Sequence, residues 1–136
     1  MVSKQVIVMR KDLNMRKGKM IAQGAHASMK VLLDLMSDTY PAPGLKQKSL
    51  YYDMYNDGSS WNDWLNGKFT KICLSVDSEE ELVEIYEKAK AKGLKCSLIV
   101  DSGLTEFNGV PTKTCCAIGP EWSEKIDEIT GHLKLL

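Results

Sequence analysis

Two polar segments that lie far apart in the chain carry the side chains that could do chemistry together. Their charged, amide, imidazole and hydroxyl residues are Arg16, Lys17, Lys19, Gln23, His26 and Lys30, followed downstream by Asp101, Thr105, Thr112 and Thr114. Such a set offers a general base, cations that can hold a polyanion or an oxyanion, and hydroxyls that can orient water. Both segments border a predicted strand end or helix start, where open α/β sheets place their ligand sites. We therefore expect the two segments to form one site.

The individual residues of this site also have simpler interpretations. Asp101 precedes Ser-Gly, a turn pair, so its carboxylate could do no more than cap that turn by bonding its own backbone. The threonines could be ordinary strand residues, because Thr favours strands. Either His26 or Asp101 could be the base, and a Thr nucleophile is also possible. The sequence contains no G-x-S-x-G, Walker A, H-E-x-x-H or G-x-G-x-x-G signature.

The first polar segment lies on a predicted helix that follows a predicted strand. Residues 5–10 are mostly apolar and β-branched, which suits a strand that is covered on both faces. The helix is predicted over about residues 18–36, and its apolar stripe, which we expect to face the core, is Ile21, Ala25, Met29, Leu32 and Met36. Lys19, Gln23, His26 and Lys30 fall on a different stripe. Periodicity therefore does not make His26 a core histidine, and a solvated polar face is the alternative.

The rest of the chain predicts a single α/β domain over residues 1–136. Further strands are predicted at 69–76, 96–100 and 114–118, and a capping box formed by Ser78 and Glu81 starts a helix that Gly93 closes. Gly119-Pro120 is expected to open the last helix, and the apolar tail 133–136 is expected to join the sheet. Two helical crossovers require parallel pairing of their flanking strands, whereas the short link before residue 114 makes one strand antiparallel. We expect a mixed four-stranded sheet with helices on both faces.

The segment 37–60 is the least regular and resembles an insertion. Pro41 and Pro43 break any helix, although residues 45–55 could form a short one, and Trp61 and Trp64 indicate another helical turn that ends at Asn66-Gly67. The aromatic residues between Tyr40 and Trp64 could be an exposed surface on which bases stack. Aromatic residues at helical spacing more often pack on the core.

Composition indicates a soluble globular protein, with cytoplasm as the expected location. Of 136 residues, 43% are apolar and 26% are charged, no apolar run could span a bilayer, and the first residues lack a signal-peptide pattern. The four cysteines have no C-x-x-C spacing, so we expect buried small apolar residues rather than metal ligands or disulfides. The formal net charge is zero, yet residues 1–30 hold seven basic residues and one acid. A basic face that binds a polyanion is therefore possible, and a merely solvated basic surface is the alternative.

These motifs, taken in order, resemble the second, archaeal and eukaryotic type of peptidyl-tRNA hydrolase. The segments that carry the resemblance are Arg10-Lys11-Asp12-Leu13, Met15-Arg16-Lys17-Gly18-Lys19, Ala22-Gln23-Gly24-Ala25-His26-Ala27, Asp101-Ser102-Gly103-Leu104-Thr105, Thr112-Lys113-Thr114, Ile118-Gly119-Pro120 and Thr130-Gly131-His132-Leu133-Lys134-Leu135-Leu136. They cover nearly the whole chain. The sequence departs from the family at Ser102, where Ala is usual, at Cys115-Cys116, where aliphatic residues are usual, and in the length of segment 37–60.

The resemblance implies an esterase that cleaves the bond between a peptide, or an N-blocked amino acid, and the 3′-terminal ribose of tRNA. It implies a mixed-sheet α/β fold, a homodimer, peptidyl-tRNA as the RNA partner, no membrane partner, and no metal or organic cofactor. The expected catalytic residues are Lys19, His26, Asp101, Thr105 and Thr114, and the expected substrate-binding residues are Arg16, Lys17, Gln23, Lys30 and Thr112. The alternative from another class is a non-catalytic, translation-associated RNA-binding module. A small-molecule-binding α/β domain would leave the basic N-terminal segment unexplained.

Overall fold

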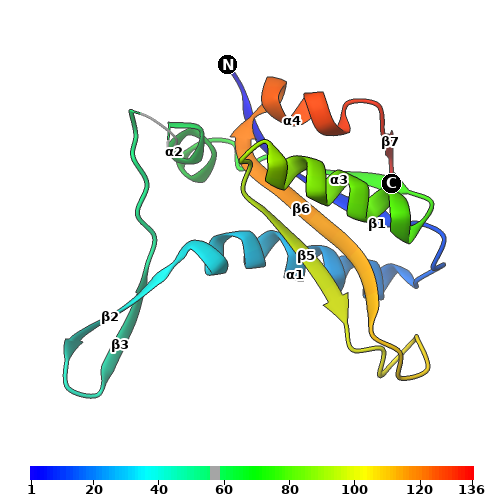
Figure 1. Cartoon of the computed structure of the whole chain (residues 1–136). Helices are drawn as coiled ribbons and strands as arrows, with labels where there is room; N and C mark the ends of the chain where they lie inside the picture. Colours follow the sequence, from blue (N-terminus) through cyan, green and yellow to red (C-terminus); the bar gives the residue numbers. More distant parts are fainter. Residues whose placement is uncertain (56–58) are drawn as a thin grey trace.

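A computed structural model describes residues 1–55 and 59–136 (Figure 1). Within these residues the strands are β1 (Ser3–Arg10), β2 (Ser37–Ala42), β3 (Leu45–Ser49), β4 (Lys71–Val76), β5 (Cys96–Asp101), β6 (Thr112–Trp122) and β7 (Lys134–Leu135). The helices are α1 (Lys17–Leu35), α2 (Ser59–Asn66), α3 (Glu79–Ala91) and α4 (Ser123–Thr130).

The main sheet of the described chain has five strands in the order β5-β6-β1-β4-β7, so the prediction of four strands was wrong. The apolar tail supplies the fifth strand, because β7 pairs antiparallel with β4. The crossover from β1 to β4 joins parallel neighbours, as predicted. Strands β4 and β5, however, are not neighbours, because β1 and β6 lie between them. Burial explains this order: every residue from 114 to 120 in β6 is buried, which suits a central strand.

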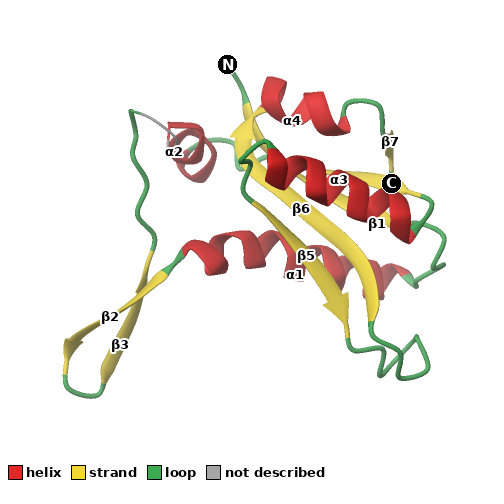
Figure 2. Cartoon of the chain, viewed as in Figure 1, coloured by secondary structure: helices red, strands yellow, loops and turns green. Residues whose placement is uncertain are grey.

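Helices cover both faces of this sheet, as predicted (Figure 2). On one face α3 and α4 pack Leu82, Ile85 and Ile126 against buried strand residues. On the other face α1 and α2 supply Val31 and Trp61 to a second cluster. The two layers hold the first turn of α1 beside the carboxyl end of β5, which is where the two polar segments meet. No helix in the described residues is long and apolar enough to cross a membrane.

Helix α1 is rotated relative to the sequence prediction, so that its inward face combines residues of the predicted polar stripe with other residues of the helix. Its buried residues include Gln23 and Val31, whereas Ile21 and Met29 of the predicted core stripe are 73% and 55% exposed. The helix turns its polar stripe inward at its N-terminal end because Gln23 has buried hydrogen-bonding partners on the strands beneath it. An amphipathic pattern gives the direction of the apolar face only when that face meets the core of the same chain.

The segment 37–60 is only partly irregular. Strands β2 and β3 form an antiparallel hairpin, so the predicted short helix over residues 45–55 was wrong, whereas α2 confirms the helical turn at Trp61 and Trp64. Residues 56–58 of the segment lie outside the described residues. Both tryptophans are buried, but Tyr40 is 69% exposed, so the aromatic residues divide between core and surface.

Two smaller predictions need correction. The last helix begins at Ser123 and not at Gly119-Pro120, because β6 stays paired with β1 as far as Trp122. Cys115 and Cys116 are buried as expected, whereas Cys73 is exposed. Cys73 is exposed because α1 does not cover this part of β4.

Candidate active site

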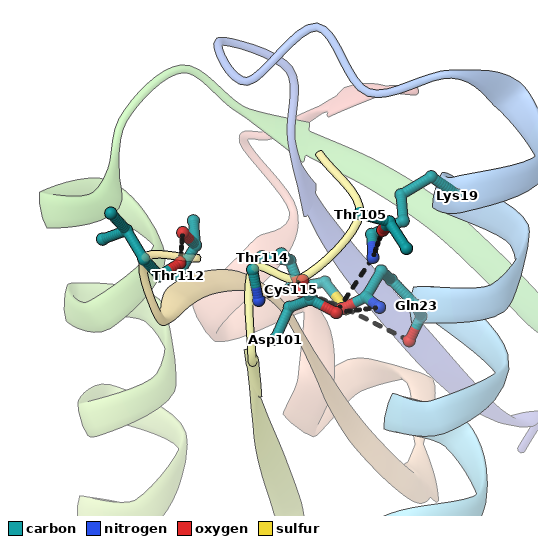
Figure 3. A network of polar contacts seen from close by, with 9 residues as sticks. Lys19, Gln23, Asp101, Thr105, Thr112, Thr114 and Cys115 are labelled. Carbon is teal, nitrogen blue, oxygen red and sulfur yellow. Dashed lines mark hydrogen bonds and ion pairs between the residues drawn. The ribbon is translucent and has the colours of Figure 1, made fainter. Parts of the chain in front are cut away.

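The ion pair between Lys19 and Asp101 lies at the centre of the candidate site (Figure 3). Lys19 is in the first turn of α1 and Asp101 is the last residue of β5, and Nζ lies 3.0 Å from Oδ1. The same ammonium donates a hydrogen bond to Oγ1 of Thr105 at 3.0 Å. Only 15% of the Lys19 side chain and 13% of the Asp101 side chain are exposed. Charges covered to this degree are screened by salt much less than surface charges.

Gln23, one turn further along α1, ties the ion pair to the sheet. Its Nε2 donates to Oδ1 of Asp101 at 3.2 Å, and its Oε1 accepts a hydrogen bond from Oγ1 of Thr114 at 2.6 Å. Its backbone carbonyl accepts from Sγ of Cys115 at 3.3 Å. Gln23 and Thr114 are 2% and 0% exposed, so this amide is fixed from both ends. These hydrogen bonds hold α1 against β6 next to Asp101.

Asp101 also caps the turn that follows β5. The backbone N–H of Gly103 donates to Oδ2 at 2.9 Å, so Asp101 does cap this turn, while its Oδ1 pairs with Lys19. Gly103 has φ +82°, and a Cβ atom there would lie 2.2 Å from the carbonyl oxygen of Val110. Only glycine fits this position. The turn therefore delivers a backbone donor to the carboxylate at a place where no side chain could be accommodated.

These contacts lower the pKa of Asp101 below its ordinary value. The hydrogen bond from Lys19 is the largest cause, and the backbone N–H of Gly103, the positive charge of Lys19 and the amide of Gln23 act in the same direction. Burial acts in the opposite direction and is outweighed. Asp101 is consequently ionised at neutral pH and is a weaker base than an ordinary carboxylate.

The structure brings together five of the expected site residues, which are Lys19, Gln23, Asp101, Thr105 and Thr114. The other five lie outside this hydrogen-bonded group, as judged from the described part of the chain. His26, Arg16 and Lys17 are exposed, Lys30 pairs with Asp34 one turn away at 3.1 Å, and Thr112 donates to the carbonyl of Val110. Thr112 lies apart from the ion pair in Figure 3.

Sequence reasoning missed three contributors to the site. Phe107 places its ring 5.8 Å from Nζ of Lys19, within cation–π range, and no sequence pattern signals this contact. Cys115 was predicted only as a buried residue, yet its thiol bonds to the backbone of α1. Gly103 could have been found, because an Asp-x-Gly turn places a backbone N–H at the aspartate side chain.

The network has the parts needed for acyl hydrolysis. A fixed ammonium can stabilise negative charge on a carbonyl oxygen, and the adjacent Thr105 hydroxyl can orient water or substrate. No group of three or more histidines, cysteines, aspartates and glutamates that could hold a metal ion occurs among the described residues. Lys19, Thr105 and Asp101 are the residues of the network that could take part in such a step.

Comparison with known proteins matches this chain to a family. A family model described as "Peptidyl-tRNA hydrolase PTH2" matches residues 3–136. The chain belongs to this family. A peptidyl-tRNA hydrolase from Methanocaldococcus jannaschii is 44% identical over 98% of this chain and 99% of its own length. A protein of the same name from Metallosphaera sedula is 38% identical over 98% of this chain and 99% of its own length. Another from Nanoarchaeum equitans is 41% identical over 97% of this chain and 97% of its own length.

A solved structure of low sequence identity has a similar fold. A solved structure of a protein of unknown function from Agrobacterium tumefaciens strain C58 covers 100% of this chain and 98% of its own, with a TM-score of 0.56 and 12% identity. At that identity the likeness concerns the fold alone. Family membership confirms the resemblance that the ordered motifs indicate.

Proposed function

We propose that this protein hydrolyses the ester bond between the peptide, or an N-blocked aminoacyl group, and the 3′ ribose of tRNA, and so recycles tRNA. The observation that carries the proposal is the covered Lys19–Asp101 pair with Thr105 beside it, in a chain of the peptidyl-tRNA hydrolase family. In this reaction water adds to the ester carbonyl and the bond to the ribose oxygen breaks. The proton released by water ends on that ribose oxygen, and the peptide leaves as a carboxylic acid.

Lys19 is the residue best placed to stabilise the transition state. Asp101 holds its ammonium in place, so a carbonyl oxygen that gains negative charge meets a fixed positive charge. Thr105 is exposed and bonds the same ammonium, which places its hydroxyl where it can orient the attacking water. Asp101 acts mainly by orienting Lys19, and its lowered pKa limits it to weak proton acceptance. An ester is sufficiently reactive for weak base assistance to serve.

Thr114 and Gln23 act through Asp101 rather than on the substrate. Thr114 is wholly buried, so substrate cannot touch its hydroxyl, and a role as nucleophile is disfavoured. Its hydrogen bond orients the Gln23 amide so that Nε2 faces the carboxylate. His26 is exposed on α1 and remains a candidate for proton transfer once substrate is bound.

The exposed cations at the start of α1 are proposed to bind the tRNA backbone. Arg16 and Lys17 immediately precede Lys19 and are solvent-exposed, so phosphates next to the reacting ribose could reach them. Lys30 and Thr112 are proposed as more distant contacts. We also propose, from family resemblance and the nature of the substrate, a cytoplasmic homodimer.

The direct test compares two substrates that differ only in the amino group. N-acetyl-aminoacyl-tRNA and free aminoacyl-tRNA are incubated with the protein, and release of the amino acid is followed. We expect much faster hydrolysis of the N-blocked substrate, because recycling must spare charged tRNA. Equal rates would refute the assignment to peptidyl-tRNA hydrolysis. Absence of hydrolysis with retained tRNA binding would favour the non-catalytic RNA-binding module.

A further inference from the structure

Strand β5 is a long and unprotected edge of the main sheet. The strand order of the described residues places β5 at one end of this sheet and β7 at the other. Strand β7 has only two residues, one of them a lysine, and both features are common ways in which proteins prevent further strand pairing. Strand β5 has six residues, and positions 96–100 hold neither a proline nor a charged side chain. Such an edge offers its backbone to another extended chain.

Helices hold β5 by its two faces and leave this edge open. On one face, Oγ of Ser97 donates a hydrogen bond to the backbone carbonyl of Ala27 in α1 at 2.8 Å. On the other face, Cys96 and Leu98 pack against the core cluster that includes residues of α3. Figure 2 shows β5 as an outer strand of the sheet. Among the described residues, β6 is the only strand that pairs with β5.

The strand register identifies which backbone groups of β5 face outward. The N–H of Gly119 donates to the carbonyl of Lys95 at 2.8 Å, so these two residues form a hydrogen-bonded pair of the antiparallel ladder. Hydrogen-bonded and non-hydrogen-bonded pairs alternate along such a ladder, and the register is regular from Cys96 to Ile99. Cys96 and Leu98 therefore direct their N–H and C=O groups away from β6. In the described part of the chain, these groups have no backbone partner.

The open edge of β5 leads directly to the candidate active site. The strand ends at Asp101, whose carboxylate holds the ammonium of Lys19, and Leu98 lies only three residues earlier, at about 10 Å. Arg16 and Lys17, the proposed contacts of the tRNA backbone, lie at the same end of α1 as Lys19. The edge of β5 runs from this site in the opposite direction along the strand. A substrate that joins a peptide to a tRNA needs a binding surface on both sides of the reacting ester.

We propose that the peptide part of the substrate binds as an added strand along the outer edge of β5. This binding mode rests on the proposed function, because the ester carbonyl at the C-terminus of the peptide must lie at Lys19. The peptide then extends from Asp101 back toward Cys96, so it runs parallel to β5. Hydrogen bonds between main chains do not depend on side chains, which suits an enzyme that must accept peptides of many sequences. A single aminoacyl residue is too short to reach Leu98.

Peptide length and backbone methylation test this pairing on the natural protein. For N-acetylated peptidyl-tRNAs of increasing length, kcat/KM should rise until the peptide matches β5, at about six residues, and then level. In a hexapeptide, methylation of single peptide nitrogens should lower kcat/KM about two- to tenfold at alternate positions only, because every second N–H faces β5. Methylation effects without this period of two, or a kcat/KM that does not depend on length, would overturn the added strand.

A matched pair of variants tests the same pairing from the side of the protein. Leu98→Pro removes an outward N–H that β6 does not use, a position at which an edge strand tolerates proline. Leu98→Ala shortens the side chain and keeps that N–H. The readout is the ratio of kcat/KM for hexapeptidyl-tRNA to kcat/KM for N-acetyl-aminoacyl-tRNA, because a loss of folded protein cancels in this ratio. Leu98→Pro should lower the ratio about two- to tenfold relative to Leu98→Ala. Equal ratios in the two variants would overturn the proposal.

Amide hydrogen exchange separates this binding mode from the proposed reaction, because it needs no hydrolysis. An N-acetylated hexapeptide of threonine and valine, which favour strands, is added to the natural chain, and exchange is followed by NMR. Exchange should slow at the amides of Cys96 and Leu98, whereas Ser97 and Ile99 already bond to β6. Unchanged exchange at Cys96 and Leu98, or protection of both before the peptide is added, would overturn the proposal. Protection by the peptide without any hydrolysis of peptidyl-tRNA would instead refute the proposed function and leave the binding edge in place.

Discussion

Replacing Asp101 by Asn tests whether the carboxylate sets up the site or only caps a turn. The carboxylate accepts three hydrogen bonds, from Lys19 and Gln23 on Oδ1 and from Gly103 on Oδ2. Asparagine has a single acceptor oxygen, so in either orientation its NH₂ group meets at least one of these donors. The substitution keeps the shape of the side chain and necessarily loses part of the network.

The expected loss follows from the type of contact that is removed. A hydrogen bond to a charged group contributes about 1.5–3 kcal/mol, which corresponds to roughly a 10- to 150-fold change in rate if it acts wholly in the transition state. We therefore expect kcat on N-acetyl-aminoacyl-tRNA to fall at least tenfold, with a smaller change in KM. Asp77→Asn is the matched control, because Asp77 follows the end of β4 and its side chain is 71% exposed. Full activity of Asp101→Asn with an unchanged circular dichroism spectrum would refute the reasoning and leave Asp101 as a turn cap.

The same variant makes a prediction about pH and stability. The pKa of Asp101 is lowered in the folded protein, so its contacts stabilise the fold above the ordinary aspartate pKa of about 3.9. That contribution is lost as pH falls through the folded pKa, where the carboxylate takes up a proton. The free energy of unfolding of the natural chain should exceed that of Asp101→Asn at pH 7, and the difference should shrink as pH falls below the ordinary aspartate pKa of about 3.9. A difference that is independent of pH would show that charge is not the cause.

Three further variants divide the site by role. Lys19→Met should lower kcat far more than it raises KM in steady-state hydrolysis, whereas Lys88→Met on α3 should change neither. Charge reversal of Arg16 and Lys17 should raise KM and make KM depend less steeply on salt concentration, because fewer counterions are released from tRNA on binding. An effect on kcat alone would instead place these residues at the reacting ester. Gly103→Ala should lower the melting temperature and activity together, because its Cβ would lie 2.2 Å from a backbone oxygen; an unchanged melting temperature would contradict that geometry.

Most elements of the fold could be predicted because their signals are local. The apolar run of β1, the capping box formed by Ser78 and Glu81, and the strand that ends at Asp101 are each read from a few neighbouring residues, and the structure confirms them. Sheet order could not be predicted in the same way. The crossover between β4 and β5 fixes their direction but not their adjacency, and β6 separates β5 from β1 because its side chains need burial on both faces.

The candidate site was predicted more completely than the helix that carries it. Motif order placed Lys19, Asp101 and Thr105 in one site, and the structure brings them within hydrogen-bonding distance. The direction in which α1 faces was wrong, because periodicity separates polar from apolar stripes without saying which stripe faces inward. Here Lys19 and Gln23 of the polar stripe turn toward the sheet, and Gln23 is only 2% exposed, whereas His26 and Lys30 of the same stripe are exposed.

The orientation of α1 links the proposed chemistry of the site to the exposure of Ile21 and Met29 on the outer side of the helix. The proposed role of Lys19 requires it to meet a carboxylate at the end of a buried strand, so the first turns of the helix direct Lys19 and Gln23 toward the sheet. Its apolar stripe is then left on the outside, where it gains stability only if another surface covers it.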